Sequence, residues 1–305
     1  MNFIRKLKKN FSLLLMSVPG MAWFILICYV PMFGIIIAFK DYRFIDGIFG
    51  SEWIGFKNFE YLFKTADAWL ITRNTILYNV FFIILGMASA VLFAIMYDAL
   101  GTRKINRVNQ TISLFPHFIS WVVGSYFVFT LLSADMGVLN KILGVFGVEP
   151  ISWYSEPKYW PFILPVCYLW KHVGYQSIIY YSNIRGFDTE YYEAARIDGA
   201  TWGQCMRYIT LPLLIPILTI MFIINVGGVM HSDFGLFYLV PKNSGMLFNT
   251  TATIDTYVYN GITAGGNANF GATSAVAFYQ SIIGFLLVIS SNAIVKKISP
   301  DNAMF

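Results

Sequence analysis

Polar and aromatic side chains interrupt several long apolar stretches of this sequence. They include imidazole, amide, ammonium and carboxylate groups, which form hydrogen bonds, and aromatic rings, which offer apolar faces. Burial of such groups in an apolar surrounding costs free energy, so they usually face a cavity or a partner helix. The candidates for a binding path are Trp121, Tyr126, Tyr168, Lys171, His172, Tyr175, Gln176, Asn225, Ser232 and Asp233.

The composition shows what kind of protein carries these groups. Of 305 residues, 57% are hydrophobic and only 12% are charged, whereas a soluble domain averages about 25% charged residues. The chain is therefore predicted to be an integral membrane protein, and disorder, collagen-like repeats and a disulfide scaffold are excluded. Its three cysteines, Cys28, Cys167 and Cys205, are not placed to form an exterior disulfide, and nothing indicates a metal or redox site.

A helix that crosses the hydrocarbon layer needs about 20 mostly apolar residues. The predicted fold is all-α, with kinks in the first span at Pro19 and Pro31. A six-helix domain over residues 11–297 lies between an N-terminal segment, 1–10, and a tail, 298–305. The six expected spans are 11–39, 75–100, 109–133, 160–182, 209–230 and 274–295.

Lys and Arg residues indicate the orientation, because they concentrate in short cytoplasmic loops. They are more numerous on the side that holds both ends of the chain, for example Arg5, Arg103 and Lys296. Both termini are therefore expected in the cytoplasm. The exterior segments are then 40–74, 134–158 and 231–273.

Several of the candidate residues also suit purely structural roles. Tyr168 and Trp170 fit rings at the interface or facing lipid, and Lys171 fits a side chain that extends to the exterior headgroups. Asn225 can hold helices together by hydrogen bonding. His172, Tyr175 and Asn225 are the preferred candidates for contact with a transported molecule.

Three further polar or flexible positions are weaker candidates. His117 follows Pro116 and is expected at a helix start near the cytoplasmic surface. Gly227 and Gly228 favour a helix break or close packing over contact with a ligand.

The long cytoplasmic loop, about 184–210, is predicted to form two short helices. Asp188 or Thr189 can cap the first helix, and Gly199 suits the left-handed position that ends it. Thr201 and Gln204 have capping-box spacing for the second helix, and Leu211-Pro212 opens the next span. The pattern alone also fits an amphipathic hairpin that rests on the membrane surface.

The residues of this loop favour a more specific interpretation. Glu193-Ala194-Ala195, Asp198-Gly199-Ala200 and Ile209-Thr210-Leu211-Pro212 resemble the EAA motif of binding-protein-dependent ABC importer permeases. In that family the loop docks into a cleft of an ATP-binding subunit. Small alanines permit a close approach and charges fix the register. The coupling residues are then Glu193, Ala194, Ala195, Asp198, Gly199, Ala200 and Arg207.

Other local motifs are similar to those of the carbohydrate branch of this superfamily, which includes maltose-type transporters. Within that branch they resemble permeases for oligosaccharides released from complex polysaccharides. The motifs are Pro31-Met32-Phe33-Gly34, Trp53-Ile54-Gly55-Phe56-Lys57-Asn58-Phe59, Arg73-Asn74-Thr75, Phe115-Pro116 and Asp255-Thr256-Tyr257-Val258-Tyr259.

The resemblance implies a type I ABC importer permease in a bacterial cell membrane, with no nucleic acid among its partners. The chain has no G-x-x-x-x-G-K-[ST] loop, so two copies of a partner ATPase would hold ATP and Mg²⁺. It would bind no cofactor and would not be an enzyme itself. A second homologous permease, as a heterodimer mate, and an extracellular solute-binding lipoprotein complete the expected assembly. Residues 231–273 are either the landing surface for that lipoprotein or a solvated loop.

In the resembling family the sugar lies near the midplane, between the two permeases. Aromatic rings stack on the apolar C–H faces of sugars, and polar groups bond their hydroxyls. Lys171 and His172 would additionally meet the carboxylate of a uronic acid, if the cargo came from an acidic polysaccharide.

Two other classes of membrane protein remain as alternatives. An enzyme acting on lipid-linked sugars would need convergent acids, but Asp98, Asp135 and Asp233 have no recognisable spacing. An ion-coupled secondary transporter would have inverted repeats and buried acids in mid-span. Either would work without an ATPase partner.

Overall fold

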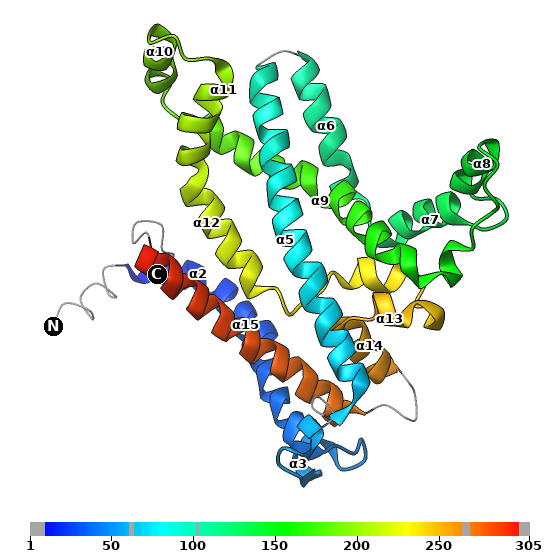
Figure 1. Cartoon of the computed structure of the whole chain (residues 1–305). Helices are drawn as coiled ribbons and strands as arrows, with labels where there is room; N and C mark the ends of the chain where they lie inside the picture. Colours follow the sequence, from blue (N-terminus) through cyan, green and yellow to red (C-terminus); the bar gives the residue numbers. More distant parts are fainter. Residues whose placement is uncertain (1–9, 61–63, 102–103, 264–268, 299–305) are drawn as a thin grey trace. The chain divides into compact units, whose positions relative to one another are not determined.

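The computed structural model describes residues 10–60, 64–101, 104–263 and 269–298. Nearly all of the expected end segments, 1–10 and 298–305, therefore lie outside the described residues, as does Arg103. The described chain is built mainly from helices (Figure 1). It divides into two compact units: one holds the N-terminal part to Lys64 with 260–279, and the other holds 65–259 with the remaining C-terminal residues.

The expected spans overlap with helices, except at residues 119–120, 133 and 228–230, which are not helical. The first span begins with α2, Phe11–Phe24, continues as a π-helix over Ile25–Tyr29 and ends as a 3-10 helix over Val30–Phe39, so its geometry changes next to Pro31. The other long helices are α5 (Ala66–Leu100), α6 (Lys104–Phe118), α7 (Trp121–Leu132), α9 (Trp160–Ile184), α12 (Leu211–Gly227) and α15 (Phe270–Ile298).

Four helical stretches of the described chain are long and apolar enough to cross a membrane alone, and a bent pair can supply a fifth span. The four are Phe11–Phe39, Ala66–Leu100, Trp202–Gly227 and Phe270–Lys297. α9, which carries Lys171 and His172, is outside this set although its 25 residues are enough to span. Six spans are compatible with these helices.

The third expected span, 109–133, contains a sharp break. α6 and α7 meet at an angle of 101° across Ile119 and Ser120. Ser120 caps α7 by accepting a hydrogen bond from the Val123 amide at 3.4 Å. The apolar run indicates the helical residues but not this change of direction, because it depends on contacts from α9 and from the segment after α12.

The first unit is organised around Phe39. Its ring stacks on Trp53 at 5.5 Å and also contacts Phe56, Phe59 and Phe278. A short antiparallel pair, β1 (Lys40–Asp41) with β2 (Glu52–Trp53), flanks the short helix α3 (Gly47–Gly50) and brings the rings together. The motif from Trp53 to Phe59 therefore encodes the aromatic core of this unit.

In the second unit, α9 packs along both α5 and α6 (Figure 1). Gly174 permits the close approach to α6, because a Cβ atom there would overlap the Ser113 carbonyl. A buried core that includes Phe82, Trp160 and Phe237 fills the space between these elements.

Residues 231–259 are a packed part of this core, which contradicts the expectation of a solvated loop over this stretch. Leu236, Phe237, Val240 and Leu247 are fully or almost fully buried. The stretch forms a π-helix over Gly235–Leu239, a 3-10 turn over Gly245–Leu247, α13 (Phe248–Thr251) and the first part of α14 (Ile254–Thr263).

The motif Arg73-Asn74-Thr75 anchors this packed stretch to α5. The Asn74 amide donates to the carbonyls of Asn249 and Ala252, at 3.1 and 3.0 Å. The Thr75 hydroxyl accepts from the Ile254 amide at 3.0 Å. The motif therefore satisfies backbone groups that no regular helix satisfies.

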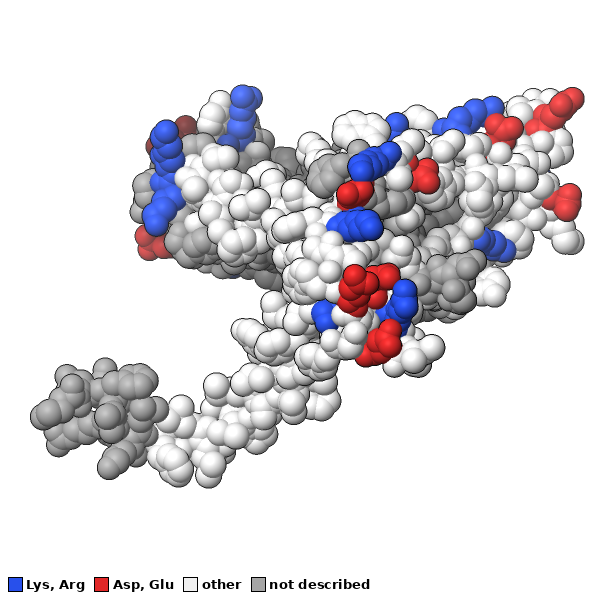
Figure 2. Space-filling model, turned by 90° about the horizontal axis from the view of Figure 1, so that it is seen from below, with Lys and Arg blue, Asp and Glu red and all other residues white. Residues whose placement is uncertain are grey.

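Charged side chains are sparse on the face seen from below. They form small separate groups between uncharged areas (Figure 2). The residues of α2 are all exposed and predominantly apolar, as expected for a helix in contact with lipid or another membrane protein.

The contact between α6 and α9 yields a stability prediction. Gly174→Ala should destabilise the protein by roughly 1–3 kcal/mol, because the added methyl group forces the two helices apart. Thermal unfolding in detergent would show a lower midpoint. Gly144→Ala in α8 (Val138–Val145) is the matched control, since a Cβ there meets no atom within 4 Å. Equal midpoints for the two variants would contradict the close approach.

Candidate functional site

The expected helical hairpin is present between α9 and α12. It consists of α10 (Glu190–Ile197) and α11 (Trp202–Cys205), and α11 continues through a π-helical turn, Met206–Thr210, into α12. Gly199 has a φ of +83°, the left-handed conformation predicted for the residue that ends the first helix.

The residues that cap the two helices of this hairpin are those that the sequence predicts. Thr201 and Gln204 form a reciprocal capping box. Asp188 accepts from the Glu190 amide at 3.0 Å, whereas Thr189 occupies the cap position without a side-chain bond. The hairpin is thus a locally determined structure.

The motif residues differ in exposure. Glu193, Ala194, Asp198, Gly199 and Arg207 are exposed, whereas Ala195 and Ala200 are half-buried. The two half-buried alanines line a shallow hollow together with Asp198 and Gly199. The hairpin therefore offers small side chains beside exposed charges to any protein that docks there.

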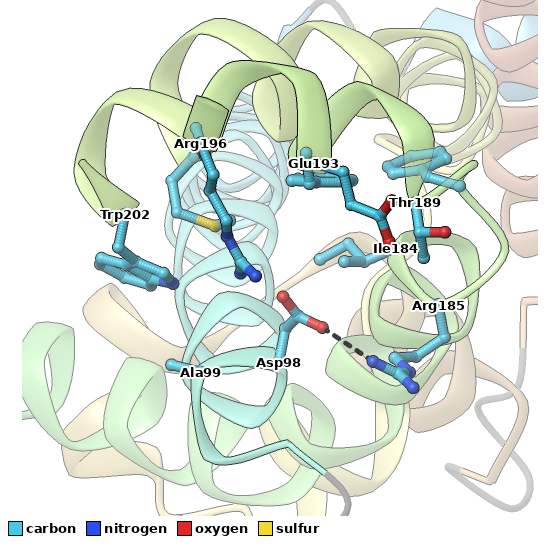
Figure 3. A pocket seen from close by; sticks show the side chains of 12 residues that line it. Asp98, Ala99, Ile184, Arg185, Thr189, Glu193, Arg196 and Trp202 are labelled. Carbon is cyan, nitrogen blue, oxygen red and sulfur yellow. Dashed lines mark ion pairs between the residues drawn. The ribbon is translucent and has the colours of Figure 1, made fainter. Parts of the chain in front are cut away.

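A second hollow lies between the hairpin and the end of α5 (Figure 3). Asp98 of α5 pairs with Arg185, which directly follows α9, at 3.6 Å. The side chains of Glu193 and Arg196 enter the same hollow from α10 (Figure 3). The sequence does not indicate this pair, because Arg185 is 87 positions away from Asp98 in the chain.

The hairpin is also joined to α12. The Tyr192 hydroxyl lies 3.0 Å from Thr210 Oγ1, and Thr210 is buried. This contact connects α10 to the start of α12, and the Asp98–Arg185 pair connects α5 to the residue that follows α9.

The central polar candidates form one cluster around Asp233. The Trp121 indole donates to the Asp233 carboxylate at 2.7 Å, and His172 Nε2 lies 3.3 Å from the same oxygen. The Leu236 amide donates to the other carboxylate oxygen at 3.2 Å. Burial by itself would raise the pKa of Asp233, but the bonds from His172, Trp121 and Leu236 outweigh it and lower that pKa.

Lys171 lies beside this cluster and is buried. Its ammonium donates to the backbone carbonyls of His117, at 3.2 Å, and Ile119. In this conformation it faces the break between α6 and α7 and extends neither to headgroups nor into open space.

The rings of neighbouring candidates pack on one another. Tyr175 stacks on His117 at 4.3 Å, and Tyr168 stacks on Phe82 at 4.0 Å while contacting His172. Tyr168 is therefore held inside the protein and is not a lipid-facing ring. His117 lies at the end of α6 remote from Lys104, which corrects its expected place at a helix start.

The remaining path candidates are dispersed around this cluster. Tyr126 of α7 is 66% exposed, and Tyr175 is 46% exposed. Gln176 has a buried side-chain oxygen, and Asn225 is half-buried in α12. Gly227 and Gly228 lie where α12 ends, as expected for residues at a helix break.

Ser232 belongs to a second cluster, which the sequence did not indicate as a site. Its amide and hydroxyl donate to Asp255 at 2.6 and 2.8 Å, and His231 Nδ1 lies 3.6 Å from the same carboxyl group. Gln280 donates to the Met230 carbonyl at 2.7 Å. In the sequence, Asp255 stands out only as the first residue of the motif Asp255-Thr256-Tyr257-Val258-Tyr259.

No three His, Cys, Asp or Glu side chains are grouped to hold a metal ion in the ranges that the structure describes. The clusters instead bind backbone groups and one another, which suits positioning and hydrogen bonding.

Comparison with known proteins identifies the family. Residues 77–300 match the family described as binding-protein-dependent transport system inner membrane component. The chain belongs to this family. Its members are transport permeases and not enzymes, so the chain is an integral membrane permease of a binding-protein-dependent ABC importer.

Individual relatives cover almost the whole permease. The polygalacturonan/rhamnogalacturonan transport system permease protein YteP of Bacillus subtilis is 32% identical, over 97% of this chain and 91% of its own length. Protein LplB of the same organism is 30% identical, over 98% and 93%. One chain of a solved bacterial ABC transporter involved in the import of the acidic polysaccharide alginate matches with a TM-score of 0.88 and 27% identity, over 98% of this permease and 100% of that chain.

The His231–Asp255 pair predicts a small dependence of stability on pH. The neighbouring carboxylate of Asp255 raises the pKa of His231 above its ordinary value of 6.5. A raised histidine pKa adds stability that is complete below pH 6.5 and is lost as the pH rises through the folded-state value. Thermal unfolding of the wild type should therefore show a slightly higher midpoint at pH 6 than at pH 8.

His231→Gln is the test of this pair. Because the His231 imidazole is half exposed, the contribution of the pair to stability should stay below about 1 kcal/mol. In the variant, the difference in unfolding midpoint between pH 6 and pH 8 should be smaller by the contribution of this pair. An unchanged difference would show that another group produces it.

Proposed function

We propose that this permease is one of two homologous subunits of an ATP-driven importer for acidic oligosaccharides. The motif of the hairpin, from Glu193 to Ala200, carries the proposal, because its small residues and exposed charges would form a docking surface at the end of two long helices. One copy of an ATPase would dock there and a second copy on the corresponding loop of the partner permease, and the two copies would hold the ATP and Mg²⁺.

The acidic nature of the cargo is supported by the relatives. Polygalacturonan is a polymer of uronic acids, and the similar solved transporter is involved in the import of acidic alginate. A further solved complex of that transporter includes an alginate pentasaccharide-bound periplasmic protein. We infer that a comparable extracellular binding protein delivers cargo here, with both termini of the permease in the cytoplasm.

The cargo path would be lined by residues near the Asp233 cluster. Tyr175 offers a ring for stacking on a sugar C–H face, and His172 offers an imidazole for a hydroxyl or a carboxylate. Trp121, Tyr126, Gln176 and Asn225 would extend the path. Closure of the ATPase pair would move the hairpin and rock this subunit against its heterodimer mate.

Replacement of hairpin residues tests the docking. Glu193→Ala and Gly199→Asp should leave the permease in the membrane but weaken its recovery with the ATPase, and ATP hydrolysis should no longer drive uptake. Glu193 supplies an exposed charge, and a side chain at Gly199 is strained at φ +83°. Affinity purification and ATPase assays in the presence of loaded binding protein would measure both effects.

Glu190→Ala is the control, since Glu190 is an exposed acid on the same helix outside the motif. Normal cargo-stimulated ATP hydrolysis in both hairpin variants would refute the docking role. Recovery of the wild type without any ATPase would reopen the alternatives of an enzyme or a secondary transporter.

The cargo is tested by uptake into proteoliposomes that contain the whole complex and its binding protein. Wild type should import oligogalacturonate in preference to neutral oligosaccharides. Tyr175→Ala should lower the apparent affinity about threefold to tenfold, because it removes one stacking ring. Phe162→Ala, at a more exposed aromatic position of α9, should have no such effect. Preference for neutral cargo would contradict the acidic class.

A further inference from the structure

The bend between α6 and α7 leaves backbone carbonyls without helical partners. α6 ends at Phe118, α7 begins at Trp121, and the two helices meet at 101°. The final carbonyls of a helix have no partner within that helix. In a bilayer there is no water to satisfy them, so another part of the protein must do so.

Lys171 supplies that partner from α9. Its ammonium donates to the carbonyls of His117 and Ile119, and only 9% of the residue is exposed. The same ammonium lies 5.3 Å from the centre of the Trp121 ring, at the start of α7. One side chain therefore contacts the end of α6, the break and the start of α7.

Trp121 connects Lys171 and the break to the negative charge of Asp233. Its indole donates to Asp233, and its ring lies against Gly235, where a Cβ atom would overlap it. Asp233 therefore balances the charge of Lys171 across the ring.

The position of Lys171 on α9 is also fixed. Gly174, three residues later and on the same helical face, lies against the backbone of Ser113 in α6. The close approach of the two helices holds the lysine stem beside the break. The ammonium is surrounded by two backbone carbonyls and the face of the Trp121 ring, so groups of the permease itself occupy its donors.

We propose that Lys171 is a positioning residue that holds the α6–α7 bend, and that it does not bind the carboxylate of the cargo. The bend in turn places His117 against Tyr175 and Trp121 against Asp233. This inference rests on the proposed function only for its consequence, which is that loss of Lys171 impairs uptake. The structural part is testable without any sugar.

Hydrogen–deuterium exchange of the cargo-free complex in nanodiscs tests the role directly. In Lys171→Met the amides of residues 119–125 should exchange about tenfold faster or more, because charge-assisted bonds to the break are lost. Exchange in α5 and in the hairpin should remain unchanged. Lys171→Arg, which retains the charge and its donors, should restore much of the protection. Lys141→Met, at an exposed lysine of α8, is the matched control.

Each outcome decides the proposal. Unchanged exchange at 119–125 in Lys171→Met would overturn it, and lower affinity for acidic cargo in the same variant would then identify a cargo ligand. Faster exchange throughout the chain would also overturn it, since that indicates general destabilisation. If Lys171→Met does not accumulate, Lys171→Gln is measured by the same criteria. Absence of uptake by the wild type would refute the proposed function alone, because the exchange result is independent of cargo.

Discussion

The need to satisfy backbone polar groups away from water governs this permease. Continuous helices meet that need internally, but a helix that bends or stops within an apolar surrounding does not. At two such points among the described residues the structure places a side chain from a distant helix. Lys171 serves the break after α6, and Asn79 of α5 donates to the carbonyls of Val229 and His231 at 2.9 and 3.0 Å.

In the residues that follow α12, several backbone groups are satisfied by side chains in the same way. Gln280 donates to the Met230 carbonyl, Asp255 accepts from the Ser232 amide, and Asp233 accepts from the Leu236 amide. Most polar side chains near the cluster therefore support non-helical backbone. On the proposed function, the side chains left to contact cargo would be those that support no backbone, and the partly exposed Tyr175 is the clearest example.

Local patterns were the most predictable from the sequence. Gly199, Thr201 and Gln204 each act within a few residues, so spacing was enough to anticipate the hairpin and its caps. The α6–α7 bend was not predictable in the same way, because the lysine that holds it is about 50 positions away. The roles of Asp98 and Asp255 were missed for the same reason, since their partners come from other helices.

The hairpin and the Asp233 cluster lie in one compact unit, and α9 and α12 connect them. α9 carries Lys171 and His172, and 13 positions later Arg185 pairs with Asp98 beside the hairpin. At 1.5 Å per residue, these points are roughly 20 Å apart along the helix. α12 makes the return connection, from Thr210 beside Tyr192 to the break that precedes Asp233. On the proposed function, a displacement of the hairpin would be transmitted to the Asp233 cluster through α9, which carries His172 near its middle, and through α12.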